Sequence, residues 1–384
     1  LTDFKIEINN FCGCQRNLLD LLIISNNKIL SILIHLFKAM DTPRRVTRNM
    51  HLQNLQKFST PLRIPPSPFM KNLGYGTGVN VYKLERSPKC GQVRSPWAVK
   101  RVSQRMRNNE NANIFNTRIQ EEAEILRKLK HPNIVGFRGI IKNTDGVETL
   151  ALECCKTSLG TILEDRNDDN LGPLPAKYIF KMITDVSNAL DYLHTEANLL
   201  HGDLKSFNVL VKGDFEICKL CDFGVSLPLD DKGLIDFAKN PKLRYVGTNL
   251  WSAPEIMDEL EVIDCKADIF SFGLIIYETI ALAPPHTLDI GDEKADDEPN
   301  TDKSIENCSL IDSDFDERTD RACGTRPPLP QAFELTDDYN IIMEIFYCCT
   351  NELAEDRPTA KTITTMLQSD EDSFLEKESL KSTA

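Results

Sequence analysis

The sequence predicts an α+β fold with two lobes. A small lobe made of an antiparallel sheet with one main helix is followed by a larger helical lobe, and a cleft lies between them. Two observations carry this prediction. Before residue 155, short runs of strand-forming residues are separated by turn residues, whereas after residue 171 long amphipathic segments with helical spacing take over. Strand-rich and helix-rich lobes in succession are typical of α+β proteins, and ligand clefts form where such lobes meet.

The small lobe is expected over residues 70–154. Runs rich in Val, Ile, Tyr and Leu indicate its strands, which we expect as a hairpin at 70–87 and single strands at 95–102 and 149–155. One helix is expected at 116–130, because apolar residues recur there at helical spacing and a His-Pro pair follows.

The large lobe is expected over residues 155–369. The spacing of its apolar residues predicts a long amphipathic helix at 176–195 and a last helix at 359–368. Between these helices, residues 289–320 are strongly acidic. Such a composition indicates a solvated, disordered insert, with a docking surface for a basic partner as the alternative. Residues 370–384 are expected to form a C-terminal tail.

The N-terminal residues differ in composition from the rest of the chain. We expect residues 1–39 to be an upstream or disordered extension, with Met40 as the true start. Residues 40–69 are polar and contain prolines, which indicates a flexible regulatory arm. Thr42 and Thr60 each precede a proline, with a basic residue two places further on, so an upstream proline-directed kinase is a candidate partner.

Composition argues against several classes of protein. A net charge of −13 disfavours nucleic-acid binding, which needs a basic face. The apolar segment 17–37 is broken by polar residues such as Asp20 and Lys28, so no membrane span is expected. Twelve cysteines without disulfide-like spacing indicate a reducing compartment, the cytoplasm or the nucleus. Cys218 and Cys221 are interpreted as buried thiols, because residues three apart on a strand face opposite sides.

Five short motifs point to chemistry. In chain order they are "GYGTGVNV" (74–81), "WAVK" (97–100), "HGDLKSFN" (201–208), "DFG" (222–224) and "APE" (253–255). Each alone is weak evidence, since a glycine turn can be a plain hairpin and a lysine can be a solvated surface residue. In this order they match protein kinases. The chain resembles protein kinases over about residues 70–369, and within them a divergent branch related to the mitogen-activated protein kinase kinases.

This resemblance implies the two-lobed protein-kinase fold. It also implies an ATP- and Mg²⁺-dependent serine/threonine kinase with dual-specificity kinship, whose substrates are proteins with serine or threonine acceptors. A role in proliferating cells around mitosis, or in MAP-kinase signalling, is likewise implied by the resemblance alone. Phosphoryl transfer needs the phosphates held, metal charge supplied and the acceptor hydroxyl aimed, and the motifs offer a candidate for each task.

The loop at 201–208 contains the candidates for the transfer step. Asp203 would accept or orient the proton of the acceptor hydroxyl, and Lys205 would neutralise the phosphate being transferred. Thr248, together with these two residues, marks specificity for serine and threonine over tyrosine. Asn208 and Asp222 offer the hard oxygen ligands that Mg²⁺ prefers.

Lys100 is the candidate for binding the α- and β-phosphates. A carboxylate from the helix at 116–130 would hold its ammonium group in place. Counting back from the end of this helix gives Glu122 as that carboxylate, and Glu121 and Glu124 are close alternatives.

The remaining nucleotide contacts are expected around the first strands. Glycines let backbone N–H groups approach phosphate oxygens, and the glycines of the first motif are Gly74, Gly76 and Gly78. The third of these falls one place early compared with the family pattern. The adenine is expected to contact Leu73, Val81 and Ala98 and the backbone of Glu153 and Cys155, with Leu152 as gatekeeper.

Two further pairings are expected to be structural. Glu255 should pair with Arg357 at the base of the helical lobe, and Asp268 should hold the backbone of the loop at 201–208. At the C-terminus the resemblance implies a PDZ-domain ligand. Ser382 fits its hydroxyl position, but Ala384 fills an apolar pocket poorly, which argues against a PDZ-domain partner.

The loop departs from the family pattern at Gly202. Kinases usually carry an arginine there, which pairs with a phosphate on the activation segment, and glycine offers no charge for this link. Residues 227–247 contain no serine or threonine, and Tyr245 is their one hydroxyl-bearing residue. We therefore expect changed regulation, through the N-terminal arm or partners, with the chemistry retained.

Two rival functions are weighed against an active protein kinase. A pseudokinase scaffold would use the same fold for partner binding, but it could have lost Lys100, Asp203, Asn208 or Asp222 freely, and all four are present. A small-molecule kinase is disfavoured because Thr248 and the APE motif build a shelf for a peptide.

Overall fold

The computed structural model describes a large part of the chain, within one compact unit that spans Ile64–Ala384. The described residues are 71–76, 79–89, 92–103, 112–142, 148–237, 243–260, 262–288, 321–330 and 335–368. Several predicted features lie outside them: the 1–39 extension, the 40–69 arm with Thr42 and Thr60, Gly78, the acidic insert 289–320 and the 370–384 tail with Ser382 and Ala384.

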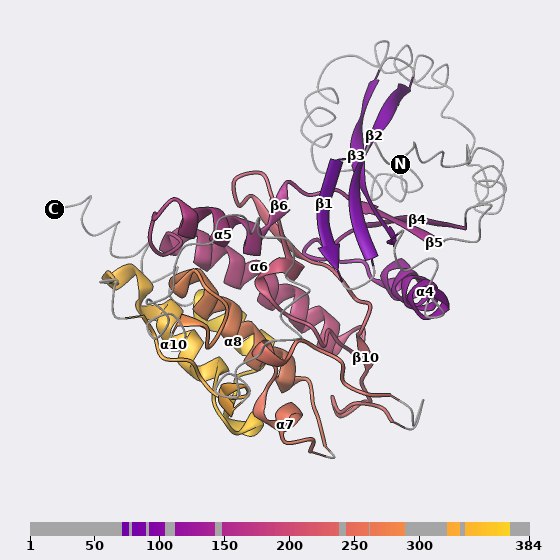
Figure 1. Cartoon of the computed structure of the whole chain (residues 1–384). Coiled ribbons are helices and arrows are strands. Elements are labelled where there is room, and N and C mark those ends of the chain that lie inside the picture. The colour runs from indigo at the N-terminus through magenta and orange to yellow at the C-terminus, as the bar shows by residue number, and fades with distance from the viewer. Residues whose placement is uncertain are drawn as a thin grey trace, which may run out of the picture. The chain divides into compact units, whose positions relative to one another are not determined.

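A five-stranded antiparallel sheet forms the N-terminal part, with the strand order β1-β2-β3-β5-β4 (Figure 1). The strands are β1 Lys71–Gly76, β2 Val79–Lys89, β3 Gln92–Val102, β4 Phe137–Lys142 and β5 Glu148–Glu153. Helix α4, Ala112–Lys128, packs against β3, β4 and β5. Its buried apolar residues Ile119, Ala123 and Leu126 follow the helical period, so one face of α4 covers the sheet.

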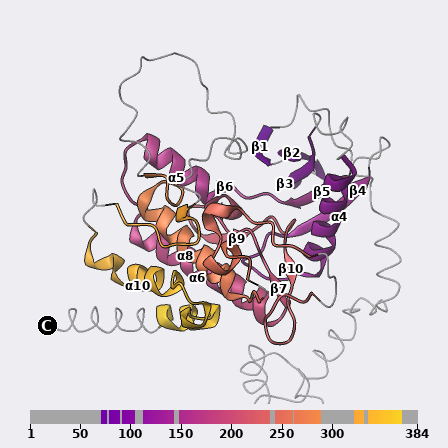
Figure 2. The same cartoon turned by 60° about the horizontal axis from the view of Figure 1, so that its bottom comes forward.

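Helices dominate the C-terminal part. They include α5 Leu159–Asp168, α6 Ala176–Thr195, α7 Pro254–Met257, α8 Lys266–Ala281 and α10 Asn340–Cys349. Helix α8 contacts both α6 and α10, and every residue from Ala267 to Ala281 is buried (Figure 2). A helix that is apolar around its whole circumference belongs at the centre of a core. The two carboxylates in α8, Asp268 and Glu278, therefore need buried partners.

Two small sheets position the loops between the helices. Strands β6 Thr157–Ser158, β8 Val209–Lys212 and β9 Ile217–Leu220 form one sheet, and β7 Leu199–Leu200 pairs with β10 Leu227–Pro228 in the other. The loop 201–208 runs from β7 to β8, and the segment 221–226 runs from β9 to β10. Because strands anchor both ends of each segment, the sheets bring the HGDLKSFN and DFG motifs together.

The predicted fold class is confirmed: an antiparallel N-terminal sheet with one main helix precedes a largely helical part. Helix α6 has the predicted bounds, whereas α4 begins at Ala112 rather than 116. The strand expected at 149–155 ends at Glu153. Its partner β3 makes its last pair with β5 there, between Trp97 and Glu153, so the next residues leave the sheet.

The first glycines lie in a strand rather than in the expected turn. Gly74 and Gly76 belong to β1, where they pair with Val81 and Val79 across to β2. A register shift between Asn72 and Gly74 marks a bulge, a feature that glycine favours in strands. The hairpin loop that joins β1 and β2 is therefore shorter than the glycine pattern indicated.

Two features of composition can be compared with this structure. The described cysteines are free thiols, and burial raises the pKa of Cys218 to about 12 and that of Cys221 well above its usual value. Cys218 is buried as expected, whereas Cys221 follows β9 and is partly buried. Within the described stretches, no helix has both the length and the apolar character that crossing a membrane requires.

Candidate active site

Lys100 is buried and lies at the centre of a charge cluster with Glu122, which is also buried, and Asp222, which is partly exposed. Its Nζ is 2.9 Å from Oε2 of Glu122 on α4 and 2.8 Å from Oδ1 of Asp222 after β9. Of the three candidate glutamates on α4, only Glu122 is buried, whereas Glu121 and Glu124 face outward. The helical period therefore selects the partner of Lys100 among the alternatives that the sequence left open.

The charges in this cluster depend on one another. Burial alone would lower the pKa of Lys100, but Asp222 and Glu122 outweigh it and raise that pKa above its usual value. Burial would likewise raise the pKa of Asp222, but the Lys100 ammonium and its hydrogen bond hold it below the usual range. Lys100 and Asp222 are therefore both charged at neutral pH.

A second cluster surrounds Asp203 in the loop 201–208. Oδ1 of Asp203 accepts hydrogen bonds from the backbone N–H (3.1 Å) and the hydroxyl (2.6 Å) of Thr248. Oδ2 accepts one from Nδ2 of Asn208 at 3.0 Å and is 3.1 Å from Nζ of Lys205. The Lys205 ammonium also donates to the Thr248 hydroxyl at 2.8 Å. The structure thus brings four of the predicted site residues into one hydrogen-bonded network.

Asp268 on α8 fixes the start of this loop. Its carboxylate accepts hydrogen bonds from the backbone N–H groups of His201 (2.8 Å) and Gly202 (3.0 Å), and it lies 2.9 Å from Nε2 of His194. Burial would raise the pKa of Asp268, but these donors and the His194 contact hold it below its usual value. A buried, ionised carboxylate therefore anchors the loop to the central helix.

Glu278, near the other end of α8, was missed by the sequence reasoning. It accepts hydrogen bonds from the backbone N–H (3.1 Å) and the hydroxyl (2.5 Å) of Ser206 and from the indole N–H of Trp251 (2.8 Å). It thereby connects the loop 201–208 with the 3₁₀ turn Asn249–Trp251 beside Thr248. A lone glutamate inside the apolar run "FGLIIYETIA" is the signal that could have found it.

Glu255 and Arg357 form the predicted ion pair. The guanidinium donates two parallel hydrogen bonds to the carboxylate, at 2.7 and 2.8 Å, and both residues are buried. This bidentate geometry fixes the APE segment against the residues that precede the last helix.

Asn208 and Asp222, which are expected to hold Mg²⁺, each have an oxygen atom that could bind the metal. Lys100 and the N–H of Gly224 engage Oδ1 of Asp222, and Asn208 uses its Nδ2 to bind Asp203. Within the described residues, Oδ2 of Asp222 and Oδ1 of Asn208 remain as hard oxygen ligands. The described part of the chain holds no cluster of three or more His, Cys, Asp or Glu that could bind a metal. A bound Mg²⁺ would thus take its other ligands from phosphate oxygens and water, as Mg²⁺ often does.

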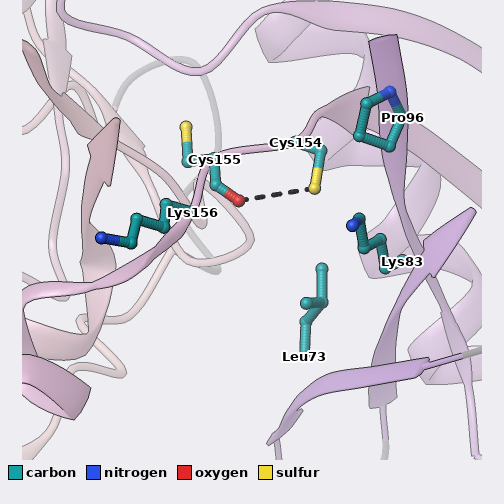
Figure 3. A pocket seen from close by; sticks show the side chains of 6 residues that line it. All are labelled: Leu73, Lys83, Pro96, Cys154, Cys155 and Lys156. Atoms are coloured by element: carbon teal, nitrogen blue, oxygen red, sulfur yellow. Dashed lines mark hydrogen bonds between the residues drawn. The ribbon is translucent and has the colours of Figure 1, made fainter. Parts of the chain in front are cut away.

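A hollow lies where β5 leaves the sheet. It has a volume of about 310 Å³ and is lined by Leu73, Lys83, Pro96, Cys154, Cys155 and Lys156. Figure 3 shows Leu73, Lys83 and the Cys154 thiol turned toward one another, and the thiol donates to the carbonyl of Cys155 at 3.4 Å. Leu73 and Cys155 belong to the predicted adenine site. The other four lining residues were not predicted, because they carry no motif.

The other expected adenine contacts lie on the strands that lead to this hollow. Ala98 on β3 and Leu152 on β5 are buried opposite one another as a cross-strand pair, and Val81 on β2 is half-buried. The backbone N–H of Glu153 donates to the carbonyl of Gly136 at 2.7 Å, so this N–H is already engaged.

The side chain of Glu153 adds a contact that the motifs did not indicate. Its carboxylate forms ion pairs with Lys212 on β8 (3.2 Å) and with Lys219 on β9 (3.1 Å). Burial would raise its pKa, but the two lysines hold the pKa of Glu153 below its usual value. The end of β5 is therefore tied to the small sheet that carries the DFG motif.

Comparison with known proteins gives consistent results. The family described as "Protein kinase domain" matches residues 68–370. A human protein named lymphokine-activated killer T-cell-originated protein kinase is 43% identical over 315 residues, which cover 81% of this chain and 93% of that protein. Mitogen-activated protein kinase kinase kinase 13-B of Xenopus laevis is 34% identical over 179 residues, 46% of this chain and 17% of that protein. Both charge clusters lie inside the family match.

Proposed function

Because the chain belongs to the protein kinase family, we propose that it transfers the γ-phosphoryl group of ATP to serine and threonine hydroxyls of other proteins. The observation that carries this proposal is the network of Asp203, Lys205 and Thr248. It places a carboxylate, an ammonium group and a hydroxyl within 2.6–3.1 Å of one another. A carboxylate beside an ammonium group suits the transfer of a phosphoryl group to a hydroxyl.

The residues of the site have separate roles in the transfer. The Asp203 carboxylate orients the acceptor hydroxyl and takes its proton, while the Lys205 ammonium, 3.1 Å away, offers positive charge to the phosphoryl group. Asp268 and Glu278 keep the loop in place through backbone and hydroxyl donors of its own residues. Such bonds, made within the chain, hold the loop in one position for the acceptor.

The nucleotide would be held between the sheet and the loops. Lys100, fixed by Glu122, would bind the α- and β-phosphates, and Asn208 and Asp222 would hold Mg²⁺. The metal would neutralise phosphate charge. We propose Gly74, Gly76 and Gly78 as further phosphate contacts and Leu73, Val81, Ala98, Glu153 and Cys155 as adenine contacts.

Pathway and regulation are proposed from the relatives and the sequence. The names of the similar proteins refer to T cells and to mitogen-activated protein kinase cascades, and we extend this to signalling in proliferating cells, in the cytoplasm or nucleus. Phosphorylation of Thr42 or Thr60 by a proline-directed kinase would regulate the enzyme. Mass spectrometry of the protein from mitotic and resting cells tests this, and phosphate at neither threonine in mitotic cells would contradict it.

The transfer itself is tested with the full chain, γ-labelled ATP, Mg²⁺ and myelin basic protein as acceptor. The parent should label the acceptor on serine and threonine, and Asp203→Asn should lower the rate by about 100- to 10,000-fold. Asp258→Asn, the same change at an exposed aspartate, should leave the rate unchanged.

Equal background rates in the parent and Asp203→Asn would leave two options, a scaffold or an enzyme that needs phosphorylation of its arm. Background rates that persist when Thr42 and Thr60 are phosphorylated would contradict a kinase and favour the scaffold. Thermal stabilisation by Mg²⁺-ATP would then show whether the scaffold still binds nucleotide.

A further inference from the structure

Gly202 lies against the aromatic ring of Tyr245. The backbone of Gly202 is left-handed, with φ of 80°, and a Cβ built there would lie 3.2 Å from the carbonyl oxygen of Val225 and 3.9 Å from Cε2 of Tyr245. The position where the family carries an arginine is thus covered by a tyrosine from the segment that precedes Thr248.

Gly247 lets this tyrosine and the loop approach each other. A Cβ at Gly247 would lie 2.6 Å from Cε1 and 2.8 Å from the hydroxyl oxygen of Tyr245, and 2.6 Å from the carbonyl oxygen of Gly202. Real Cβ atoms do not come this close, so any larger residue at 247 would force these groups apart. The backbone next to Thr248 therefore sits directly on the backbone next to Asp203, with the Tyr245 ring beside both.

The hydroxyl end of Tyr245 reaches two further elements. It lies close to the side chains of Ser252, just after the turn Asn249–Trp251, and of Ser271 on α8. Its ring packs on a buried apolar cluster that includes Leu200, Trp251 and Phe270. Burial raises the pKa of Tyr245, and the nearby carboxylates of Asp268 and Asp203 raise it further, so the hydroxyl keeps its proton.

We propose that Tyr245 is a positioning residue that holds the acceptor-facing segment on the catalytic loop, in place of an arginine–phosphate pair. Three steps along the chain from Tyr245, Thr248 donates two hydrogen bonds to Asp203, from its backbone N–H and its hydroxyl, and these set the geometry of the acceptor site. The anchor is uncharged and needs no phosphate, which agrees with Gly202 and with the lack of serine and threonine in residues 227–247. This inference rests on the proposed kinase activity.

The same geometry argues against Tyr245 as a phosphorylation site. Its ring packs on the buried apolar cluster and its hydroxyl lies against Gly247, so this conformation does not present the hydroxyl to an activating kinase. A phosphate on that oxygen would also lie near the carboxyl groups of Asp268 and Asp203, which disfavour added negative charge.

The test uses the full chain, with its phosphorylated residues mapped by mass spectrometry and Thr42 and Thr60 in the same phosphorylation state in the parent and every variant. Tyr245→Phe removes only the hydroxyl, and Tyr245→Leu also removes the ring. Tyr347→Phe is the matched control, because Tyr347 is 46% exposed on α10. Three quantities are measured: kcat/KM for the acceptor protein, the affinity for a fluorescent ATP analogue, and hydrogen–deuterium exchange of residues 243–252.

If Tyr245 is an anchor, kcat/KM for the acceptor protein should fall more in Tyr245→Leu than in Tyr245→Phe, while nucleotide affinity should not change. Tyr245→Phe should lower kcat/KM for the acceptor about 3- to 10-fold, and Tyr245→Leu by roughly 100-fold. Exchange of residues 243–252 should rise in the same order, while nucleotide affinity stays within about twofold and Tyr347→Phe matches the parent.

Three results would overturn the inference. The first is folded Tyr245 variants that match the parent in both transfer and exchange. The second is a loss of nucleotide affinity in step with transfer, which would indicate general damage. The third is phosphate on Tyr245 of the active enzyme, with activity lost on its removal. If the parent itself, with Thr42 and Thr60 phosphorylated, transfers no more than Asp203→Asn, the proposed function fails, and the exchange of residues 243–252 still decides whether Tyr245 is an anchor.

Discussion

Both carboxylate oxygens of Asp203 are engaged by groups of the chain itself. Thr248 occupies one of them with two donors, and Asn208 and Lys205 engage the other. An arriving hydroxyl therefore competes with the Thr248 hydroxyl for Oδ1, while the backbone N–H of Thr248 keeps the carboxylate oriented. The hydrogen bonds of Thr248 to Asp203 therefore hold the segment that contains Thr248 against the loop 201–208.

Replacing Thr248 separates the role of its hydroxyl from that of its backbone. Thr248→Ala removes the donor to Asp203 and the acceptor for Lys205, and we expect kcat/KM for a protein acceptor to fall by about 10- to 100-fold. Thr248→Ser keeps the hydroxyl and should stay within about threefold of the parent. Initial rates with myelin basic protein measure both, and equal activity of the alanine and serine variants would show that the hydroxyl is dispensable.

Helix α8 organises the site through its only two carboxylates, Asp268 and Glu278. They lie ten residues apart, which is about 15 Å along a helix. Asp268 binds the first residues of the catalytic loop, and Glu278 binds Ser206 and Trp251 further along. One rigid, fully buried helix therefore sets the position of both ends of the loop and of the turn after Thr248.

Glu278 predicts how stability depends on pH. Burial raises its pKa to about 7, against the pull of Ser206 and Trp251, whereas a glutamate in the unfolded chain titrates near 4.5. The Glu278 carboxyl thus stays protonated to a higher pH in the folded protein than in the unfolded chain. Its contribution to stability is complete below about pH 4.5 and is lost as pH rises through 7, a change of about 3 kcal/mol.

Glu278→Gln isolates this effect because glutamine does not titrate. Denaturant unfolding of the parent and the variant at several pH values between 4.5 and 8 should show that the parent loses about 3 kcal/mol relative to the variant over this interval. Identical pH profiles for the two proteins would show that Glu278 does not titrate in this range.

Some elements of the site could be predicted from the sequence because local rules specify them. The helical period places Glu122 on the buried face of α4 and leaves Glu121 outside. The glycine pattern predicted a turn at Gly74 and Gly76, but both residues belong to strand β1. Single-sequence spacing cannot separate a glycine that turns the chain from one that creates a bulge, because both uses exploit the missing side chain.

At the scale of the whole molecule, the contacts that join distant segments escaped prediction. Glu278 meets Ser206 across 72 positions of sequence, and Glu153 meets Lys212 across 59. The contact of Tyr245 with Gly202 depends in the same way on how the loop and the segment fold back on α8. Such pairs form only when the chain packs into its tertiary structure. A sequence motif predicts such a pair only where the family pattern already links the two positions.

The measurement that tests the account most directly compares Glu122→Gln with Glu121→Gln in phosphate transfer by the full chain. Both variants make the same chemical change on neighbouring positions of α4, but only Glu122 touches Lys100. We expect Glu122→Gln to lower kcat/KM for ATP by about 10-fold or more and Glu121→Gln to match the parent. Equal rates in the two variants would contradict the claim that the Lys100–Glu122–Asp222 cluster is the phosphate-binding part of an active kinase.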